Sequence, residues 1–476
     1  FSQGNYEILN EKLKKKSPVF HYHEDLVDII WENRPALSKN PAFILDEKYS
    51  GKSTTEKLEE IREYLNKEEG DYLLIGSLDD IAWTFNIRGG DVTNNPVVIS
   101  YTLIGKKDAR LFVDLDKLSV EVKAVLSSQG VECLPYEDVF KVLGDLEEGV
   151  SVILQKDRVN RLVYSSIPET VSIISQDNIT TKLKGIKNTV EIQNQRIAYL
   201  KDGVALTKFF YWLDKNIGKL EIDEISAGEK LLKFRKEQEG FIEPSFGTIS
   251  AYGSNGAMMH YSASLDKFSK LEDKGLYLID SGGQYYNGTT DTTRTVALGE
   301  ITDEEKEDFT LVLKGHINLI SARFLMGTSG HALDVLARYP LWMKGVDYKS
   351  GTGHGIGHLL NVHEGPHRIA TAVNSVALEE GMIVSIEPGV YKENKHGIRI
   401  ENVVVVQEDI KTDSGEFLSF ENLTLCHIDL NCIDPSMLNQ HEKDWLNDYH
   451  REVYNKISPF LTEEEKEWLK EKTKEI

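Results

Sequence analysis

The chain has little cysteine and no long apolar run. Its 476 residues include only three cysteines, Cys133, Cys426 and Cys432, without the spacing of a metal-binding motif. We therefore expect no disulfide framework, and we expect a reducing compartment. No window holds roughly eighteen consecutive apolar residues, and the opening segment FSQGNYEILNEKLKKK has no apolar run of the signal-peptide kind. We expect a chain that neither spans a membrane nor is anchored to one.

Basic residues are also in short supply. Lys and Arg total 55 against 77 Asp and Glu, so the formal net charge is −22. This charge argues against nucleic acid or an anionic membrane as a partner, because both carry negative charge themselves. It is typical of a soluble enzyme of the cytosol, and we expect a cytoplasmic location.

The length predicts more than one domain. Residues 1–47 are polar, are broken by prolines and lack an initiator Met, which indicates the remnant of a first domain plus a linker. Residues 48–183 alternate amphipathic helices with apolar strands, which is typical of an α/β domain. Residues 184–412 begin with helices and then become rich in strands. Residues 413–476 are predicted to form a helical extension that packs on this last domain.

The second half of the chain has clear element signals. Helical periodicity predicts helices over residues 188–217 and 222–239, the latter with Asp223 as N-cap. Two amphipathic helices are expected in the tail, in KDWLNDYHREVYNKI and TEEEKEWLKEKTKEI. Strands are predicted in the strings FGTISAYG, GLYLIDSGG, TTRTVALG, GMIVSIEPG and IRIENVVVV.

Two aspartates flank a turn signal in LIDSGGQYYNGTTDTTRT. Asp280 ends an apolar strand, and Asp291 begins the return arm after Asn287-Gly288, a strong type I′ hairpin signal. In an ideal hairpin on that turn, Asp291 faces Gln284, about 13 Å along the strand from Asp280 and too far for a shared metal pair. If the aspartates converge, the chain must bend near Gly282-Gly283 or form a wider loop. Taken alone, both are better explained as turn and cap residues.

A glycine-rich string, GTGHGIG at residues 351–357, carries His354. Its glycines allow positive φ angles and a close approach of the backbone to a ligand, or they could cradle a phosphate. We disfavour phosphate because no GxxxxGK[ST] motif is present and acidic neighbours would repel it. His354 and His358 form an HxxxH pair, but the pair lacks the glutamate of a zinc-binding helix, and the glycines disfavour a helix.

Two glutamates lie at or within apolar strands. Glu387 ends GMIVSIE just before Pro388-Gly389, where a buried strand stops and a carboxylate needs a partner. Glu401 lies within IRIENVVVV, an apolar strand that rarely tolerates an unpaired charge. A metal ion would offset that cost, and so would Arg399, which strand alternation places on the same face. A salt-bridged or rim glutamate is the alternative at both positions.

Taken together, the four carboxylates and the imidazole indicate a two-metal hydrolytic centre. Two divalent ions would balance four carboxylates and leave a near-neutral site that can hold and activate a hydroxide. Ligands that are mostly oxygens, with one imidazole, favour Mn²⁺, with Co²⁺ or Zn²⁺ as alternatives. The reaction class is then hydrolysis of an amide or an ester.

The chain resembles the M24 metallopeptidases, and more closely their long-form Xaa-Pro aminopeptidases, the aminopeptidases P. The resemblance implies an α+β fold in which a C-terminal pita-bread (creatinase/aminopeptidase) catalytic domain follows a smaller α/β creatinase-N-like domain. Full-length members carry a further N-terminal domain, of which residues 1–47 match only the end and the following linker. The resemblance covers nearly the whole chain, in the strings DLVDIIWENRP, LDDIAWTFNIRGGDVTNNPV, NGAMMHY, LIDSGGQYYNGTTDTTRT, LKGHINL, GTGHGIGHLLNVHEGP, EEGMIVSIEPGVY, GIRIENVVVV and KDWLNDYH.

The resemblance also implies a role for each ligand-type residue. Asp291 and Glu401 would bridge the two metal ions. Asp280 would complete the coordination of one ion, and His354 with Glu387 that of the other. Glu387 would in addition act as general base toward the water that attacks the carbonyl before proline.

Four residues outside the ligand set also belong to strings that resemble the family. His260 and His363 resemble histidines that hold the substrate carbonyl or shuttle a proton to the leaving proline nitrogen, with ordinary core histidines as the alternative. Trp83 and Arg88 belong to a signature of the preceding domain. We expect Trp83 to be a core residue and Arg88 to be either a substrate contact or a structural residue.

The resemblance predicts an aminopeptidase that removes an N-terminal residue preceding proline, acts on peptides with proline at the second position and forms a homodimer. Prolidase, a dipeptidase with the same fold, is the nearest alternative. A creatinase-like enzyme without metal is disfavoured because all five ligand positions are kept. The alternative from a different class is a non-catalytic pita-bread module that binds peptides or proteins.

Overall fold

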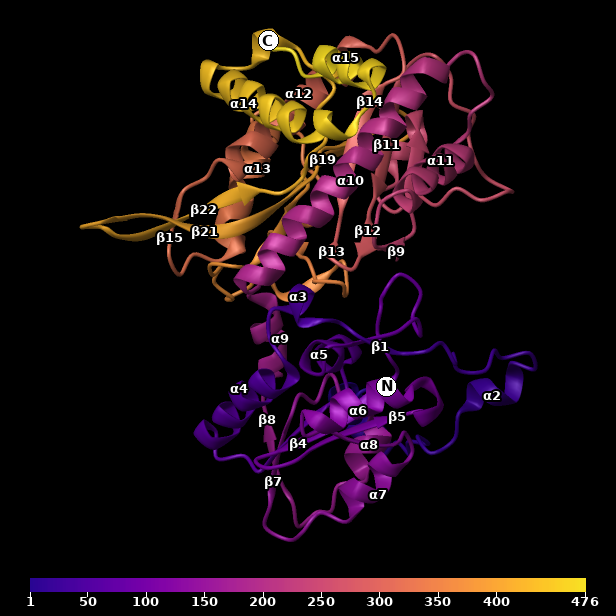
Figure 1. The fold of residues 1–476 in the computed structure, drawn as a ribbon, viewed down its shortest axis with the longest axis vertical. Coiled ribbons are helices and arrows are strands. Elements are labelled where there is room, and N and C mark those ends of the chain that lie inside the picture. Colours follow the sequence, from indigo (N-terminus) through magenta and orange to yellow (C-terminus); the bar gives the residue numbers. More distant parts are fainter. The chain divides into compact units, whose positions relative to one another are not determined.

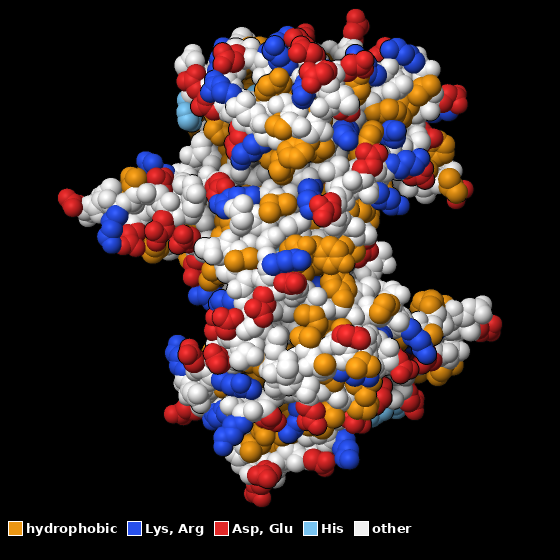
Figure 2. All heavy atoms as spheres, in the orientation of Figure 1, with side chains coloured by type: hydrophobic (Ala, Val, Ile, Leu, Met, Phe, Trp, Pro, Cys, Tyr) orange, Lys and Arg blue, Asp and Glu red, His pale blue; other side chains and the backbone are white.

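The computed structural model describes residues 1–476, which fold into two compact units, Phe1–Lys184 and Gly185–Ile476 (Figure 1). No helix in either unit is both long and apolar enough to cross a lipid bilayer. Figure 2 shows acidic side chains spread over the visible surface among basic ones, with no large basic patch. The finer division of the chain into four segments, at residues 47, 183 and 412, stays a prediction.

The first unit is built on a mixed sheet of six strands in the order β6-β5-β4-β2-β7-β8. Its strands are β2 (Tyr72–Ile75), β4 (Ser100–Gly105), β5 (Ala109–Val113), β6 (Glu132–Pro135), β7 (Ser151–Leu154) and β8 (Ser172–Ser175), and β1 (Phe43–Ile44) pairs with β3 (Ile87–Arg88) outside it. Its helices are α1 (Gln3–Leu13), α2 (Leu26–Ile30), α3 (Glu47–Ser50), α4 (Thr54–Lys67), α5 (Leu78–Thr84), α6 (Val120–Ser128), α7 (Asp138–Gly144), α8 (Arg161–Ser165) and α9 (Ile179–Gly185).

Alternation along the strands sends side chains to both faces of this sheet. Leu73 and Ile75 of β2 pack in one core with α4 and α6, whereas Leu74 packs in a second core with α7 and α8. A strand that is buried on both faces must be apolar at successive positions, and YLLI meets that requirement. The prediction of alternating helices and strands in this region is confirmed.

The second unit contains six α-helices, α10 (Thr189–Asn216), α11 (Glu224–Lys236), α12 (Asp303–Ile320), α13 (Gly330–Trp342), α14 (Gln440–Ile457) and α15 (Glu463–Lys472). Asp223 caps α11 as predicted, because its side chain accepts from Ser226 N. Asn188 and Glu191 form a capping box at the start of α10. Both helices predicted in the tail form, as α14 and α15.

Four sheets complete the second unit. Its three-stranded sheets have the orders β10-β11-β14 and β13-β12-β9, a six-stranded sheet has the order β15-β22-β21-β18-β16-β17, and β19 pairs with β20. The strands are β9 (Phe241–Pro244), β10 (Ile249–Tyr252), β11 (Leu276–Ser281), β12 (Gly283–Tyr285), β13 (Gly288–Thr289), β14 (Thr292–Ala297), β15 (Phe324–Leu325), β16 (Gly353–Gly355), β17 (Glu364–Ile369), β18 (Ile383–Ile386), β19 (Gly389–Lys392), β20 (His396–Arg399), β21 (Asn402–Thr412) and β22 (Gly415–Asn422).

A large apolar core joins the helices of this unit to its strands. Side chains of α10, α11, α12, α14 and α15 pack in one cluster with those of β11 and β14, Phe209, Phe309 and Leu446 among them. Each such side chain contributes about 1.5 to 3 kcal/mol when it leaves water. The tail helices therefore belong to the main core of the second unit.

Candidate metal centre

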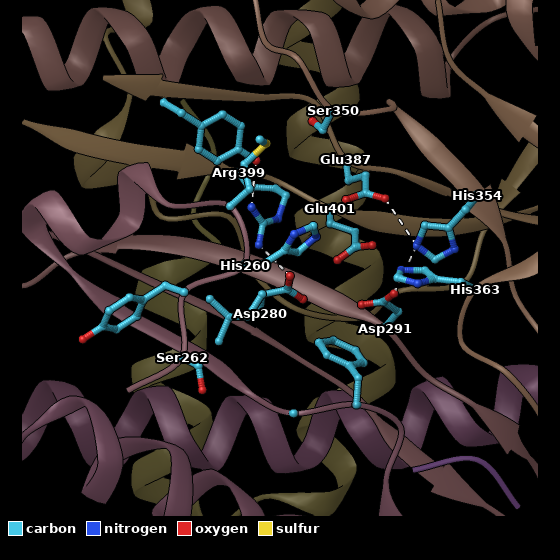
Figure 3. Close-up of a pocket in the computed structure, with 16 residues that line it drawn as sticks. His260, Ser262, Asp280, Asp291, Ser350, His354, His363, Glu387, Arg399 and Glu401 are labelled. Carbon is cyan, nitrogen blue, oxygen red and sulfur yellow. Dashed lines mark hydrogen bonds and ion pairs between the residues drawn. The ribbon is translucent and has the colours of Figure 1, made fainter. Parts of the chain in front are cut away.

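A cavity of about 290 Å³ lies within the second unit. Its lining includes all five ligand-type residues predicted from the sequence and both additional histidines (Figure 3). These residues are Asp280, Asp291, His354, Glu387, Glu401, His260 and His363.

The aspartates meet because the hairpin has a different register from the one the Asn-Gly signal indicates. Asp280 is paired with Thr293, and Tyr285 with Gly288, so the turn consists of Tyr286 and Asn287. The regular Asn287-Gly288 hairpin does not form, as convergence of the aspartates requires. In the observed register Asp291 lies opposite Gly282, which makes Asp280 and Asp291 diagonal neighbours about 7 to 8 Å apart at Cα.

Gly282 permits the close approach of the two arms. A Cβ added there would lie 1.8 Å from Thr290 O and 2.2 Å from Ser245 Oγ, so the position has no room for a side chain. Both arms lose regular strand structure at this point, between β11 and β12 on one side and between β13 and β14 on the other. The predicted bend near Gly282-Gly283 is therefore the place where the strands break.

His354 lies on β16, which is paired with β17 on one side and with β18 on the other. A Cβ on Gly353 would lie 1.9 Å from Ser385 O, and one on Gly355 would lie 2.2 Å from Glu364 O. The glycines thus serve strand packing, and none of residues 351, 353, 355 and 357 adopts the positive φ angle that glycine allows. Since β16 is a strand, a two-histidine helix is excluded.

The tautomer of His354 follows from its hydrogen bond. Nδ1 lies 2.9 Å from Gly355 O, and because a carbonyl can only accept, Nδ1 carries the proton. In the neutral ring Nε2 then carries the lone pair, and it faces Asp291 Oδ2 at 3.5 Å and Glu387 Oε1 at 3.3 Å. An acceptor directed at two carboxylates is the arrangement expected of a cation site.

Glu387 follows the last residue of β18, as predicted, and Ser385 holds it. The Ser385 hydroxyl donates to Glu387 Oε1 at 3.0 Å and accepts from His354 N at 3.0 Å. One serine therefore fixes both a carboxylate and the strand that carries the imidazole. No motif in the sequence singles out Ser385, although strand alternation places it on the same face as Glu387.

Glu401 lies in a break between two strands, not within one. β20 ends at Arg399 and β21 starts at Asn402, so the alternation that would pair Glu401 with Arg399 does not hold. Arg399 instead pairs with Asp280, at 2.6 Å between Nη2 and Oδ2. Glu401 Oε2 accepts from the Thr293 hydroxyl at 2.9 Å. The arginine alternative for Glu401 is therefore wrong, and Thr293 is a site residue that sequence reasoning missed.

The carboxylates crowd one another in a buried space. Burial, then the charges of Asp280 and Glu387, raise the pKa of Asp291 well above its usual range. Burial, then Asp291 and Glu387, do the same to the pKa of Glu401. Such shifts mark a site where negative charge lacks compensation.

The donor set fits divalent metal ions. One oxygen of Asp280, Oδ1, is buried and has no hydrogen-bond partner. Ligand atoms of Asp291, His354 and Glu401 all lie within 4.8 Å of one another. Carboxylate oxygens with one imidazole suit Mn²⁺, Co²⁺ or Zn²⁺ better than ions that prefer thiolates.

The two additional histidines line the cavity, and neither is a core residue. The ring of His363 lies edge-on to that of His354, with centroids 4.1 Å apart. Desolvation, then the neighbouring His354, lower the pKa of His363 to about 4. His260 follows a short 3₁₀ helix, residues 253–257, whose Gly256 contacts the backbone of Gly397 on β20. His358 does not line the cavity.

The two residues singled out in the first unit are both buried. Trp83 belongs to the core, as predicted, and Lys57 Nζ lies 4.6 Å from the centre of its ring. Arg88 donates from Nη1 to Ala82 O at 2.7 Å and to Ile87 O at 3.1 Å. A substrate role for Arg88 stays a prediction.

Comparison with known proteins identifies the family. Residues 193–408 match the model of metallopeptidase family M24. A probable Xaa-Pro aminopeptidase P from Coprinopsis cinerea is 42% identical, over 97% of this chain and 78% of the relative. The chain belongs to metallopeptidase family M24. Within this M24 peptidase, residues 33–191 match the creatinase/prolidase N-terminal domain, and residues 416–476 match the C-terminal region of M24 peptidases.

Solved structures agree with this M24 assignment. The X-prolyl aminopeptidase of Caenorhabditis elegans, a cytosolic enzyme with a di-nuclear active site, superposes with a TM-score of 0.94 at 35% identity, covering 100% of this chain and 79% of that one. The Xaa-Pro dipeptidase of Bacillus anthracis gives a TM-score of 0.62 at 25% identity, covering 79% and 99%. The predicted fold class, a pita-bread catalytic domain after a creatinase-type N-terminal domain, is confirmed.

Proposed function

We propose that this M24 peptidase is a metal-dependent aminopeptidase that cleaves the bond between an N-terminal residue and a following proline. The observation that carries the proposal is the convergence of four carboxylates and the Nε2 of His354 on one cavity. Relatives named for Xaa-Pro aminopeptidase activity, alike over nearly the whole chain, support the choice of substrate.

Two divalent cations are the proposed cofactors, with Mn²⁺ the first candidate. Asp291 and Glu401 would be shared between the ions. Asp280 would complete the ligand set of one ion, and His354 with Glu387 that of the other. When bound, the ions would lower the pKa of a water molecule and polarise the scissile carbonyl.

The side chains around the ligands supply proton transfer and orientation. Glu387 is the proposed general base, since Ser385 holds its Oε1 and its carboxylate opens to the cavity. His363, neutral near pH 7 because its pKa is about 4, can donate a hydrogen bond to the substrate carbonyl or pass a proton to the proline nitrogen. His260 on the cavity wall is proposed for the same duties. Arg88 remains a proposed substrate contact.

The extent of the likeness to solved structures favours an aminopeptidase over a dipeptidase. The C. elegans X-prolyl aminopeptidase matches the whole of this chain, whereas the B. anthracis Xaa-Pro dipeptidase matches 79% of it at a much lower TM-score. We further propose a cytosolic location, in line with the C. elegans enzyme, and a homodimeric state.

The proposed activity is tested by comparing Xaa-Pro-Xaa tripeptides with Xaa-Pro dipeptides after loading with Mn²⁺. We expect release of the first residue from the tripeptide at a much higher kcat/KM than from the dipeptide. Asp291→Asn should lower kcat by more than about 100-fold. Mutation of a residue that only holds a metal ligand in place already lowers metal affinity or activity about 10- to 100-fold.

Asp116→Asn, the same kind of substitution at an exposed position in the first unit, is the control and should leave kcat unchanged. A strong preference for the dipeptide would assign the chain to the prolidases instead. Absence of hydrolysis together with absence of Mn²⁺ binding would favour a non-catalytic module.

A further inference from the structure

The string KDWLNDYH, residues 443–450, lies on α14 and has no part in the ligand set. Its Tyr449 and His450 are buried, and the Trp445 ring stacks on Tyr449 with centroids 5.3 Å apart and an angle of 11°. Figure 1 shows α14 beside α12, in the part of the second unit coloured last along the chain. This helix therefore points aromatic side chains inward from the C-terminal region.

The Tyr449 hydroxyl is a junction of hydrogen bonds. It lies 2.6 Å from Cys426 O and 3.1 Å from Thr424 O, and it accepts from Cys426 N at 3.3 Å. It also accepts from Arg294 Nη2 at 2.8 Å. Tyr449 thus connects the C-terminal helix to an arginine on β14, three residues after Asp291.

Arg294 is a buried cation whose hydrogen bonds all go to uncharged acceptors. Its side chain is 1% exposed. Nε donates to His427 O at 3.0 Å, and Nη2 donates at 2.8 Å both to Cys426 O and to Asn402 Oδ1. The planar guanidinium has five N–H groups in a fixed fork, so its partners hold it in one orientation.

The remaining nitrogen of the guanidinium, Nη1, binds backbone carbonyls near Asp291 and at Glu401. Nη1 of Arg294 donates to Glu401 O at 2.6 Å and to Thr293 O at 2.9 Å. Glu401 N donates to that same Thr293 O at 3.1 Å, and the Thr293 hydroxyl donates to Glu401 Oε2 at 2.9 Å. Arg294 therefore ties the backbone of Glu401 to the strand that begins just after Asp291.

We propose that Arg294, oriented by Tyr449, is a positioning residue that sets the spacing between Asp291 and Glu401. The C-terminal region then helps to set the geometry of the metal centre. Without the fork, the break between β20 and β21 loses its anchor, and the two carboxylates can no longer face two ions at one fixed separation. The inference rests on the proposed metal-dependent function.

The test uses Tyr449→Phe in the full chain, because this change keeps the ring and its stack on Trp445 and removes only the hydroxyl. Mn²⁺ binding is measured by titration calorimetry, and coupling between two bound ions by electron paramagnetic resonance. We expect affinity for at least one Mn²⁺ to fall 10- to 100-fold and the coupled signal to weaken, as for other outer-shell partners. The value of kcat should fall with KM little changed.

Tyr211→Phe is the matched control. Tyr211 on α10 donates its hydroxyl to Glu464 Oε2 of α15 at 3.1 Å, so it also ties the C-terminal region down, but through an exposed contact away from the cavity. It should leave Mn²⁺ affinity, the coupled signal and kcat as in the parent. Arg294→Lys, which keeps the charge and loses the fork, should weaken Mn²⁺ binding more than Tyr449→Phe does.

The outcomes separate the two proposals. A parent chain that binds no Mn²⁺ overturns the proposed function. A parent that binds two ions, with Tyr449→Phe binding them equally well, overturns the positioning role even if the variant unfolds at a lower temperature. Circular dichroism establishes that each variant is folded, and Tyr449→Phe decides alone if Arg294→Lys does not fold.

Discussion

Gly282 shows how one position without a side chain makes room for the site. Asp280 and Asp291 come together because the arms that carry them approach each other so closely that Gly282 has no room for a Cβ. Both strands are interrupted at this point, and a backbone group there binds a side chain, since the hydroxyl of Thr290 accepts from Gly283 N at 2.9 Å. At the residue scale, the site depends as much on a missing side chain as on the ligands.

Gly282→Ala is expected to destabilise the second unit and to weaken Mn²⁺ binding. The added methyl would overlap Thr290 O and Ser245 Oγ, and overpacking of this kind costs about 1 to 3 kcal/mol. Urea unfolding followed by tyrosine and tryptophan fluorescence measures the loss, and calorimetry measures the affinity.

Gly228→Ala is the matched control. Gly228 lies inside α11, where the nearest atom to an added Cβ is Thr248 Cγ2 at 3.6 Å. Here alanine should raise the free energy of unfolding by up to about 1 kcal/mol, because glycine is the poorer helix former. A Gly282→Ala variant as stable as the parent would show that the close approach of the two arms does not constrain this position.

The ligand-type residues could be predicted from the sequence, but the charge partners among them could not. The positions of Asp280, His354 and Glu387 follow from strand ends and glycine patterns, which are local. The pairing of Arg399 with Asp280 is not local, since it joins segments more than a hundred residues apart and depends on how two sheets face each other. Periodicity within one strand cannot supply that information.

Helix boundaries were accessible to prediction because caps are local chemistry. Asp223 at the start of α11 and the amphipathic pattern of α15 both act within a few residues. The break at Ile400 and Glu401 was not accessible, because the apolar string IRIENVVVV reads as one strand. Its two parts belong to different sheets, with β20 paired to β19 and β21 to β18 and β22.

Thr462→Ala is expected to fray α15. Thr462 and Glu465 form a capping box, and loss of such a cap costs about 1 kcal/mol. Amide exchange measured by mass spectrometry should become faster over residues 463–472 while the β11 and β14 peptides are unchanged.

Thr473→Ala, at the other end of α15, is the control. The Thr473 hydroxyl donates to Leu469 O, a carbonyl that the Thr473 amide already reaches. Its removal should change exchange less than Thr462→Ala does. Equal effects of the two substitutions would contradict the capping explanation.

At the scale of the whole molecule, the second unit buries neutral imidazoles. Burial, then the charge of Arg294, lower the pKa of His316 and of His450 to about 3. Burial also lowers the pKa of His427 well below its usual value. The Nε2 of His450 accepts from Ile428 N at 3.1 Å, so Nε2 carries no proton and the ring is neutral in the folded chain.

These histidines predict a loss of stability in acid. Between pH 6.5 and about 3 these histidines bind protons in the unfolded chain but stay neutral in the folded chain. The free energy of unfolding therefore falls as pH falls through this window. Each histidine contributes a slope of up to about 1.4 kcal/mol per pH unit. Urea unfolding at a series of pH values measures it.

His450→Gln should reduce that slope, since the amide oxygen can accept from Ile428 N without titrating. His441→Gln, at an exposed position on the same helix, is the matched control for the substitution itself. An unchanged slope in His450→Gln would show that groups other than His450 cause the loss of stability in acid.

The ligand-type side chains come from separate strands and strand breaks spread between Asp280 and Glu401. In an unfolded chain, gathering them would cost the entropy of closing several loops at once, so only the folded second unit offers the site. Every ion that binds there therefore stabilises the folded state alone, by about 2.7 kcal/mol at a hundred times the dissociation constant. The concentration of metal around the protein then sets the free energy of unfolding of the second unit.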